Sequence, residues 1–431
     1  MPKLDAGNTA WMIAATALVL LMTPGLALFY GGMVRAKNVL AMLMQNFVCM
    51  GIVSVLWVVD LFSLAFGKDK LGGFVGSAAT YVGLHHGADI WGSTGVPTSV
   101  IATFQITFAI ITAALITGAT ADRLRFAPFV VFVTAWSILV YAPIAHWVWG
   151  GGLLAQHHVE DFAGGTVVHI NAGVAGLALT LVLGKRIGWP KERMRPHNVP
   201  FVLLGAGLLW FGWIGFNAGS ELAADATAGY ALINSVVATA AAMLGWLVVE
   251  KVRDGHSTTL GAASGLVAGL VAITPACGFI TPVSAIWLGL AAGAICALAV
   301  GVKFKFGFDD SLDVFAVHLV GGIVGALSIG LLGDATINSA GSNGLFNGGG
   351  FTQLGRQFLG VGSVIGYTFV VTFVIAKIID KAMGLRVSRD VELEGLDINL
   401  HAESAYDYGT PATHGGVSLA AATASAQKVD A

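Results

Sequence analysis

Charged side chains are scarce in this chain. Asp, Glu, Lys and Arg make up only 11% of its 431 residues, whereas 56% are apolar and the mean hydropathy is +0.80. A soluble domain typically carries about 25% charged residues, so this chain lacks the polar surface needed to face water on all sides. Its formal net charge of −2 also argues against a nucleic-acid partner. The composition therefore predicts a polytopic membrane protein.

Cysteine and the short motifs of common enzymes are also scarce. The sequence contains no P-loop, no metal-ligand spacing and no nucleophile elbow. The first apolar stretch, Trp11 to Tyr30, is too long for the core of a cleavable signal and lacks an Ala-x-Ala site. We therefore expect no enzyme activity, no cofactor and no bound metal. Because they sit in or beside apolar segments, we interpret three residues as small buried hydrophobes: Cys49, Cys277 and Cys296.

Long apolar runs are abundant, and they predict the membrane spans. A spanning helix needs about 20 largely apolar residues. The run at 258–275 is the weakest candidate for a separate span, because Pro275 and Gly278 end it abruptly. The fold class predicted is an all-α polytopic membrane protein with eleven transmembrane helices, at residues 10–32, 39–66, 99–119, 128–148, 164–184, 200–220, 228–250, 258–275, 282–302, 312–333 and 356–383.

The basic residues indicate how these helices are oriented. Of 22 Lys and Arg, all but Lys3, Lys68, Lys70 and Arg356 follow odd-numbered helices or belong to the last helix end and the tail. Lys and Arg accumulate on the cytoplasmic side of membrane proteins. The alternation therefore predicts an external N-terminus, an internal C-terminus and an odd number of spans.

Two helices carry the same pattern around a histidine. His169 and His318 each follow a Val, each is followed by Gly four and seven residues later, and an Asp precedes each by eight residues (Asp161, Asp310). At about 100° per residue, positions 0, +4 and +7 share one helix face. Each imidazole therefore shares a helix face with two glycines, which allow another helix to pack closely against that face.

The motif recurs five helices later in the opposite orientation, which is typical of an inverted repeat. We place repeat one at about 10–184, repeat two at about 200–333 and a final helix at about 356–383. Each histidine then lies roughly 9–13 Å inside a ~30 Å apolar core, from opposite faces. This depth places both near the midplane, without showing that they touch.

A lone histidine in an apolar helix is usually hydrogen-bonded across helices and purely structural. The duplicated context of His169 and His318 favours function instead, because titratable groups inside apolar helices mark pathways for ions or protons. Two neighbouring neutral imidazoles can share a proton and offer their outer nitrogens to a small polar guest.

Several aromatic residues and acids have ordinary structural interpretations when taken alone. Phe104 and Phe108, four apart, are typical of core or lipid-facing packing, and Asp161, like Asp310, is typical of a helix cap. An external Trp usually belongs to the aromatic belt. Trp149, with Phe216 and Ser220 at another outer helix end, could instead hold a small cation by cation–π attraction and a hydrogen bond. The residues alone leave this choice open.

Longer motifs resemble the ammonium transporter family (Amt/Mep/Rh) from Gly7 to about Tyr408. They are TPGLALFYGG at 23–32, DFAGGTVVHIN at 161–171, GFNAGS at 215–220, DVFAVH at 313–318 and the tail segments GLD at 395–397 and HAESAY at 401–406. The sequence departs from the family at Asp60, in the Gly-rich loop 334–350 and beyond Tyr408. None of these departures touches the pore motifs.

The resemblance implies a role for each matching residue. In this family an outer site recruits ammonium, two stacked Phe rings gate the path, and twin histidines line a hydrophobic pore. An acid holds the outer site in shape and is a candidate for assisting deprotonation. The matching residues are Trp149, Phe108, Ser220 and Phe104 for recruitment, Phe108 and Phe216 for the gate, His169, His318, Trp213 and Tyr141 for the pore, and Asp161 with Asp310 for the acid role.

The resemblance also implies a homotrimer in the plasma (cytoplasmic) membrane, each subunit with its own pore. Many members bind a PII-type signal protein at the cytoplasmic face. Residues 384–431 would form a cytoplasmic tail that couples the subunits, disordered after about 408. The main alternative is an ammonium sensor of the same fold with little flux. A third possibility, passage of CO2 or water, rests on the apolar pore.

Overall fold

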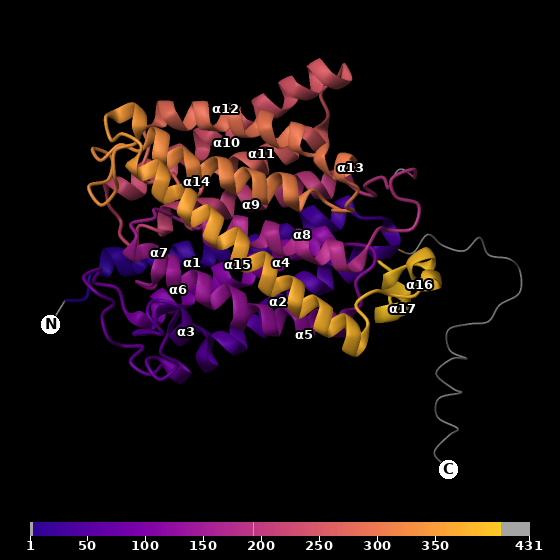
Figure 1. Cartoon of the computed structure of the whole chain (residues 1–431), viewed down its shortest axis with the longest axis horizontal. Helices are drawn as coiled ribbons and strands as arrows, with labels where there is room; N and C mark the ends of the chain where they lie inside the picture. The colour runs from indigo at the N-terminus through magenta and orange to yellow at the C-terminus, as the bar shows by residue number, and fades with distance from the viewer. Residues whose placement is uncertain (1–2, 193, 407–431) are drawn as a thin grey trace, which may run out of the picture.

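The computed structural model describes residues 3–192 and 194–406 as a bundle of long helices lying side by side (Figure 1). Within these residues, ten helices are long and apolar enough to cross a membrane. The run predicted at 258–275 forms α11 (Thr259–Ile273), whose 15 residues fall short of the roughly 20 that a full crossing needs. The described part of the chain is therefore an all-helical, multi-pass membrane protein with one shorter apolar helix.

Most predicted spans appear at their expected places, although several are built from more than one helical segment. In the first part of the chain the elements are α1 (Ala6–Met33), η1 (Ala36–Asn38), α2 (Val39–Leu56), η2 (Trp57–Leu61), α3 (Phe62–Phe66), η3 (Val82–Leu84), α4 (Thr98–Thr120), α5 (Phe126–Trp136), η4 (Ser137–Tyr141), α6 (Ala142–Val148), α7 (Leu153–Gln156), η5 (Gly165–Ile170) and α8 (Asn171–Leu183).

The second part continues in the same way. Its elements are α9 (Val199–Gly219), α10 (Ala226–Asp254), α11, α12 (Pro282–Ala299), α13 (Val302–Phe306), η6 (Phe315–Val320), α14 (Gly321–Leu332), η7 (Leu345–Asn347), α15 (Thr352–Met383), α16 (Arg389–Glu394) and α17 (Leu396–His401). The loop after α3 also contains a short two-stranded antiparallel hairpin, β1 (Asp69–Lys70) and β2 (Val75–Gly76), which lies outside the long helices and leaves the predicted all-α class unchanged.

Both histidine motifs lie in short π-helical segments at the start of their spans. His169 belongs to η5 and His318 to η6, and each segment runs directly into an α-helix, α8 or α14. A π-helical turn inserts an extra residue into the helical repeat, and such turns often occur at functional sites. The sequence pattern predicted regular α-helix here, so the local geometry differs from the expectation.

The glycines after each histidine allow these two helices to touch, as the spacing predicted. A Cβ at Gly173 would lie 2.5 Å from the backbone nitrogen of Leu319, and one at Gly322 would lie 2.9 Å from a side-chain carbon of Ile170. Both distances are shorter than van der Waals contact, so a larger residue would separate the helices. Close approach through small residues is a common way for helices to associate in lipid.

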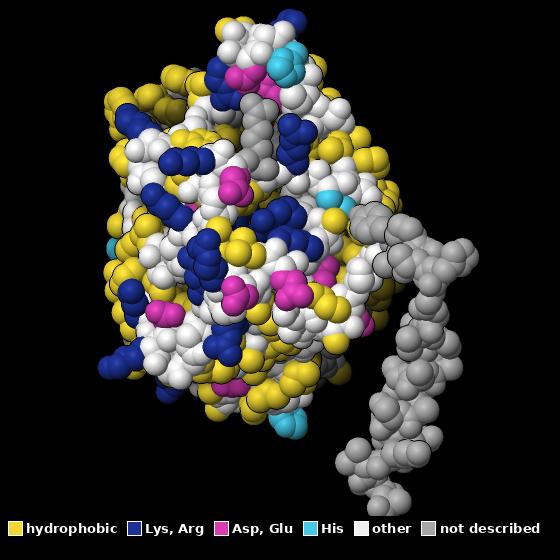
Figure 2. All heavy atoms as spheres, turned by 90° about the vertical axis from the view of Figure 1, so that its right-hand side faces the viewer, with side chains coloured by type: hydrophobic (Ala, Val, Ile, Leu, Met, Phe, Trp, Pro, Cys, Tyr) yellow, Lys and Arg dark blue, Asp and Glu magenta, His cyan; other side chains and the backbone are white. Residues whose placement is uncertain are grey.

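One end of the bundle carries the short C-terminal helices and many basic side chains. α16 and α17 lie at the right-hand end of Figure 1, and Figure 2 shows Lys and Arg gathered on that end. The tail is attached there by Asp397, whose carboxylate accepts hydrogen bonds from the backbone N–H groups of Leu40 and Ala41 at 3.0 and 2.8 Å. The segment predicted to be disordered after about 408 lies outside the described residues.

Replacing Gly173 by Val should destabilise the protein by about 1–3 kcal/mol, because the side chain would overlap the backbone at Leu319. The matched control is Gly207→Val, since a Cβ at Gly207 has nothing within 4 Å. Thermal unfolding in detergent measures both variants. Equal melting temperatures for the two would contradict the proposed helix contact.

Candidate functional site

The two predicted histidines face each other in the interior of the bundle. Nδ1 of His169 lies 3.3 Å from Nδ1 of His318, the ring centroids are 5.4 Å apart, and the ring planes differ by 18°. The residues are 1% and 3% exposed. Because a hydrogen bond between two ring nitrogens uses one proton, one Nδ1 donates and the other accepts. The pair therefore shares a single proton position between the two halves of the chain.

A narrow apolar cavity runs along this pair. Its volume of about 10 Å³ has room for roughly one small molecule. Apart from the two imidazoles its lining is hydrophobic, and Nε2 of His169 has no hydrogen-bond partner among the described residues. The other lining residues are Met22, Leu26, Ile111, Leu115, Leu209, Trp213, Phe216 and Val267.

An aromatic stack closes the cavity on one side of the histidines. The rings of Phe108 and Phe216 are stacked at 4.1 Å with an interplanar angle of 21°, and both residues are almost fully buried. Trp213 stacks on His169 at 5.3 Å and donates a hydrogen bond from Nε1 to Oγ1 of Thr274 at 2.8 Å. Two stacked rings leave no space for a guest between them, so a ring must rotate before anything passes.

Beyond the Phe pair lies a wider cavity of about 280 Å³. Trp149 and Ser220 line it, together with Phe66, Trp91, Ile101, Gln105, Val148, Phe162 and Leu222. Trp149 meets Phe108 edge to face at 5.9 Å and donates from its indole Nε1 to the backbone oxygen of Asp161 at 3.0 Å. Trp149 and Ser220 therefore line one cavity, and Phe108, the third residue that the family resemblance assigns to recruitment, contacts Trp149.

Two of the predicted site residues lie behind this path rather than along it. Phe104 is fully buried and packs on Phe108 with ring centroids 4.8 Å apart. Tyr141 lies in an aromatic cluster, with its ring centroid 6.3 Å from that of Trp57 and 6.4 Å from that of Trp136. Neither residue is among those lining the two cavities. Their contacts indicate support of the site's walls.

Asp161 and Asp310, which each precede a histidine by eight residues, differ in the number of hydrogen bonds that their carboxylates accept. Asp161 accepts from the backbone N–H groups of Gly164, Gly165 and Thr166 at 2.6–2.8 Å, from that of Val167 at 3.3 Å and from the hydroxyl of Thr166. The turn that aims these donors at one carboxylate requires the positive φ of Gly164, which is +114°. Asp161 therefore caps η5, as its position before the helix predicted.

Asp310 is held more loosely. It accepts a backbone bond from Phe315 at 2.7 Å through Oδ2, while its buried Oδ1 has no partner among the described residues. Burial raises the pKa of Asp310 to about 6, against the opposing effect of Lys303 and with a further rise from Asp313. Burial also raises the pKa of Asp161, although the hydrogen bonds from Thr166 and the two glycines favour its ionised form.

Two neighbouring acids, Glu221 and Asp225, lie next to Ser220. Burial and the neighbouring carboxylate of Asp225 raise the pKa of Glu221 to about 7. No sequence pattern singles out Glu221, because its effect depends on the loop that brings Asp225 against it. Among the described residues, no cluster of three or more His, Cys, Asp and Glu is arranged to hold a metal ion.

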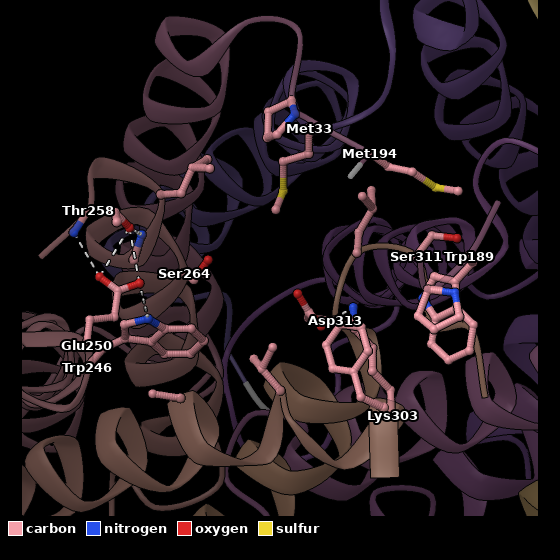
Figure 3. A pocket seen from close by; sticks show the side chains of 18 of the residues that line it. Met33, Trp189, Met194, Trp246, Glu250, Thr258, Ser264, Lys303, Ser311 and Asp313 are labelled. Carbon is pink, nitrogen blue, oxygen red and sulfur yellow. Dashed lines mark hydrogen bonds and ion pairs between the residues drawn. The ribbon is translucent and has the colours of Figure 1, made fainter. Parts of the chain in front are cut away.

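A larger cavity of about 480 Å³ lies beside Leu312 and Asp313, just before the segment η6 that carries His318. Figure 3 shows Glu250 bonded to Thr258 and Trp246 on one wall, with Lys303 and Asp313 on the opposite wall. Lys303 pairs with Asp313 at 2.6 Å. Because these charges are already paired, the cavity is a polar vestibule rather than a strong site for an anion.

One buried polar network was not anticipated from the sequence. Thr274 accepts from Trp213 and donates to Oδ1 of Asn217 at 3.3 Å, and Asn217 donates to Ser235 at 2.7 Å. These side chains come from α9, α10 and the end of α11, so nothing local in the sequence links them. The network fixes the indole that stacks on His169.

A protein-family comparison places this arrangement in a known group. The model of the Ammonium Transporter Family matches residues 10–406. This chain belongs to the ammonium transporter family. The family consists of transporters rather than enzymes, and the ten helices of the described residues that are long and apolar enough to cross a membrane agree with a multi-pass protein.

Curated relatives and solved structures agree with this assignment. An ammonium transporter of Mycobacterium tuberculosis is 53% identical over 94% of this chain and 91% of its own, and one of Bacillus subtilis is 46% identical over 94% and 99%. A crystal structure of Saccharomyces cerevisiae Mep2 matches with a TM-score of 0.81 at 35% identity, covering 90% of this chain and 91% of that one. A structure described as a sensor Amt protein matches with a TM-score of 0.85 at 30% identity, covering 91% and 98%.

Replacing Asp161 by Asn should destabilise this transporter by about 2–3 kcal/mol, because an amide NH2 would face backbone donors. The matched variant Asp310→Asn should cost less, since Asp310 accepts the Phe315 bond through one oxygen and its other oxygen has no partner among the described residues. Thermal unfolding of both variants in detergent makes the comparison. A larger loss for Asp310→Asn would contradict the assignment of Asp161 as the structural acid.

Proposed function

We propose that this member of the family carries ammonium across the plasma (cytoplasmic) membrane by removing its proton and conducting ammonia past His169 and His318. The observation that carries the proposal is the contact between two imidazoles in a cavity otherwise lined by hydrophobic side chains. An apolar passage penalises a whole cation heavily but admits a small neutral molecule.

Recruitment begins in the outer cavity. The indole of Trp149 and the ring of Phe108 offer π faces to a small cation, and the hydroxyl of Ser220 can accept a hydrogen bond from it. Ser220 itself donates to the backbone oxygen of Phe216 at 2.8 Å, which leaves the lone pairs of its oxygen as acceptors for the guest. Asp161 acts through Trp149, whose indole it holds by its backbone oxygen.

Passage then requires the Phe gate to open. The stacked rings of Phe108 and Phe216 separate the outer cavity from the histidine cavity, so rotation of one ring admits the substrate. Ammonium gives up its proton at this boundary to the histidine pair, and ammonia, which is both a donor and an acceptor, enters. Nε2 of His169, which has no partner among the described residues, offers it a hydrogen-bonding group.

This route discriminates ammonium from potassium by chemistry rather than by size. The two ions are similar in size, but potassium has no proton to lose and would enter the apolar cavity with its full charge. We propose that the proton follows by way of the paired histidines, which share one proton position, so that transport is electrogenic. Ammonia then regains a proton in the inner vestibule.

The proposed topology has eleven spans, an external N-terminus, an internal C-terminus and an inverted repeat. It is supported by the equal Asp-to-His spacing, the π-helical start of both motifs and the concentration of basic residues at the end that carries the tail. In this arrangement α11 crosses as the short eighth span. The first repeat comprises about 10–184 and the second about 200–333.

We further propose a homotrimer with one pore in each subunit and a PII-type signal protein as a partner at the basic end. Apolar side chains such as Leu232, Leu244 and Val248 are exposed along α10, so these faces must meet lipid or another subunit. A pore contained within one chain is compatible with three independent pores.

An ammonium sensor is the second candidate function, and one observation favours it: the structural likeness to a sensor Amt protein. The closed Phe stack is compatible with either function. Robust uptake of ammonium in a transport-deficient cell would exclude a pure sensor, whereas binding without uptake would favour it.

Replacing both His169 and His318 by Ala should lower the ammonium current about 100-fold, because the relay of the proton and the hydrogen bonds to ammonia are lost. The Asp variants should instead admit potassium, since a carboxylate binds a bare cation. Currents in proteoliposomes with ammonium and with potassium measure both effects. His157→Ala, an exposed outer-loop histidine, is the control. Unchanged current and selectivity in the pore variants would refute the mechanism.

Single introduced cysteines test the topology, because the three native cysteines are buried. A thiol at Leu4, which is 60% exposed, should react with an impermeant reagent in intact cells. A thiol at Val252, which is 83% exposed, should react only after the membrane is permeabilised. The opposite result at either site would overturn the proposed orientation.

A further inference from the structure

His146 lies at the outer end of α6, three residues before Trp149, and is completely buried. Its Nδ1 is 3.0 Å from the backbone oxygen of Ala65, and its Nε2 is 3.1 Å from Oδ1 of Asp69. A backbone oxygen can only accept hydrogen bonds, and the same holds for an ionised carboxylate. A ring that satisfies both partners must donate from both nitrogens, which makes it an imidazolium.

The turn that carries Trp149 is wrapped around this ring. The backbone N–H groups of Gly150 and Gly152 donate to the His146 backbone oxygen at 3.0 and 2.9 Å. A Cβ at Gly150 would lie 2.5 Å from Nδ1 of the ring, and one at Gly152 would lie 2.8 Å from Cδ2. The ring and the backbone of His146 are therefore packed closely against the segment that follows Trp149.

The same turn is fastened to the small hairpin β1–β2. Nε1 of Trp147 donates to the backbone oxygen of Phe74 at 2.9 Å, and the N–H of Leu153 donates to that of Gly73 at 3.0 Å. Asp69 is the hairpin residue that pairs with His146, and its side chain is 40% exposed. Solvent therefore reaches the carboxylate, while the imidazole behind it stays dry. The exposed Lys68 and Lys70 flank Asp69.

We propose that His146, as an imidazolium paired with Asp69, is a positioning residue for the outer site that weakens ammonium binding when the external solution becomes alkaline. A neutral ring would keep its bond to Ala65 and turn a lone pair of Nε2 toward the carboxylate. Attraction then becomes repulsion, and the hairpin holds the turn of Trp149 only by the bonds to the backbone oxygens of Gly73 and Phe74. This inference rests on the proposed recruitment of ammonium at Trp149.

Asp69→Asn separates the two protonation states. An Asn amide can donate to Nε2 of a neutral ring that still donates from Nδ1 to Ala65, so the link persists without a charge. Asp69→Ala removes the link altogether. Both substitutions lie in a partly exposed loop, which avoids the packing damage that a change at His146 itself would cause. Asp89→Asn is the control, because Asp89 pairs with His86 in the same outer loop and both side chains are exposed.

The experiment measures the ammonium current of proteoliposomes from about pH 6 to about pH 8.5, as a function of ammonium-ion concentration. In the wild type and in Asp89→Asn, the half-saturating concentration should rise about tenfold with pH, which corresponds to loss of one charge-assisted hydrogen bond. It should stay low in Asp69→Asn and high in Asp69→Ala. Maximal currents should agree within about twofold, which shows that each variant is folded.

The other titratable groups near the site are the same in all of these proteins. Glu221 and Asp161, which lies beside Trp149, are present in every variant, so the difference between the wild type and Asp69→Asn isolates the His146–Asp69 pair. Identical pH dependence in those two proteins, or a wild-type value for Asp69→Ala, would overturn the inference. Absence of any ammonium current in the wild type would instead remove the proposed function.

Discussion

The contact between His169 and His318 is the constraint on which the rest of the site depends. Two imidazoles 3.3 Å apart can share one proton only if both helices approach closely and water is kept away. Close approach requires glycine at Gly173 and Gly322, where any Cβ would overlap the facing segment. The dry surroundings come from the hydrophobic lining and from the stacked Phe rings. The close approach and the dry surroundings both matter because the two imidazoles lie in a wall that is otherwise hydrophobic.

The site is asymmetric although its two histidine motifs are similar. Beside Trp149, the carboxylate of Asp161 accepts several hydrogen bonds and its backbone oxygen accepts one from the indole. At the other end Asp310 has a buried oxygen without a partner among the described residues, and the cavity there is wider. In the proposed mechanism the substrate is selected before the Phe pair and released into the polar vestibule. Selection and release therefore fall on opposite sides of the histidines.

The sequence predicted the elements of the path that depend on local patterns. The histidine motifs, their glycine stripes and the cap at Asp161 all follow from spacing along one helix, and the structure places them as expected. The π-helical form of η5 and η6 was not predictable, because the spacing of His and Gly is equally compatible with an α-helix. The aromatic stack of Phe108 and Phe216 depends on two helices far apart in sequence, so it came from family resemblance.

Features that join distant segments were missed for the same reason. The position of Tyr141 beside Trp57 and Trp136, the network of Thr274 and Asn217, and the pairing of His146 with Asp69 depend on tertiary packing. A lone His near a helix end has many possible partners, and the short hairpin that supplies Asp69 has no strong strand signal.

The most direct test of the central claim is the current that follows a rapid ammonium pulse on proteoliposomes containing the wild-type protein, compared with an equal potassium pulse. A passage that strips the proton and returns it inside predicts a clear current with ammonium and none with potassium. Equal currents for the two ions would show that a whole cation crosses beside the histidines, which would contradict conduction of neutral ammonia.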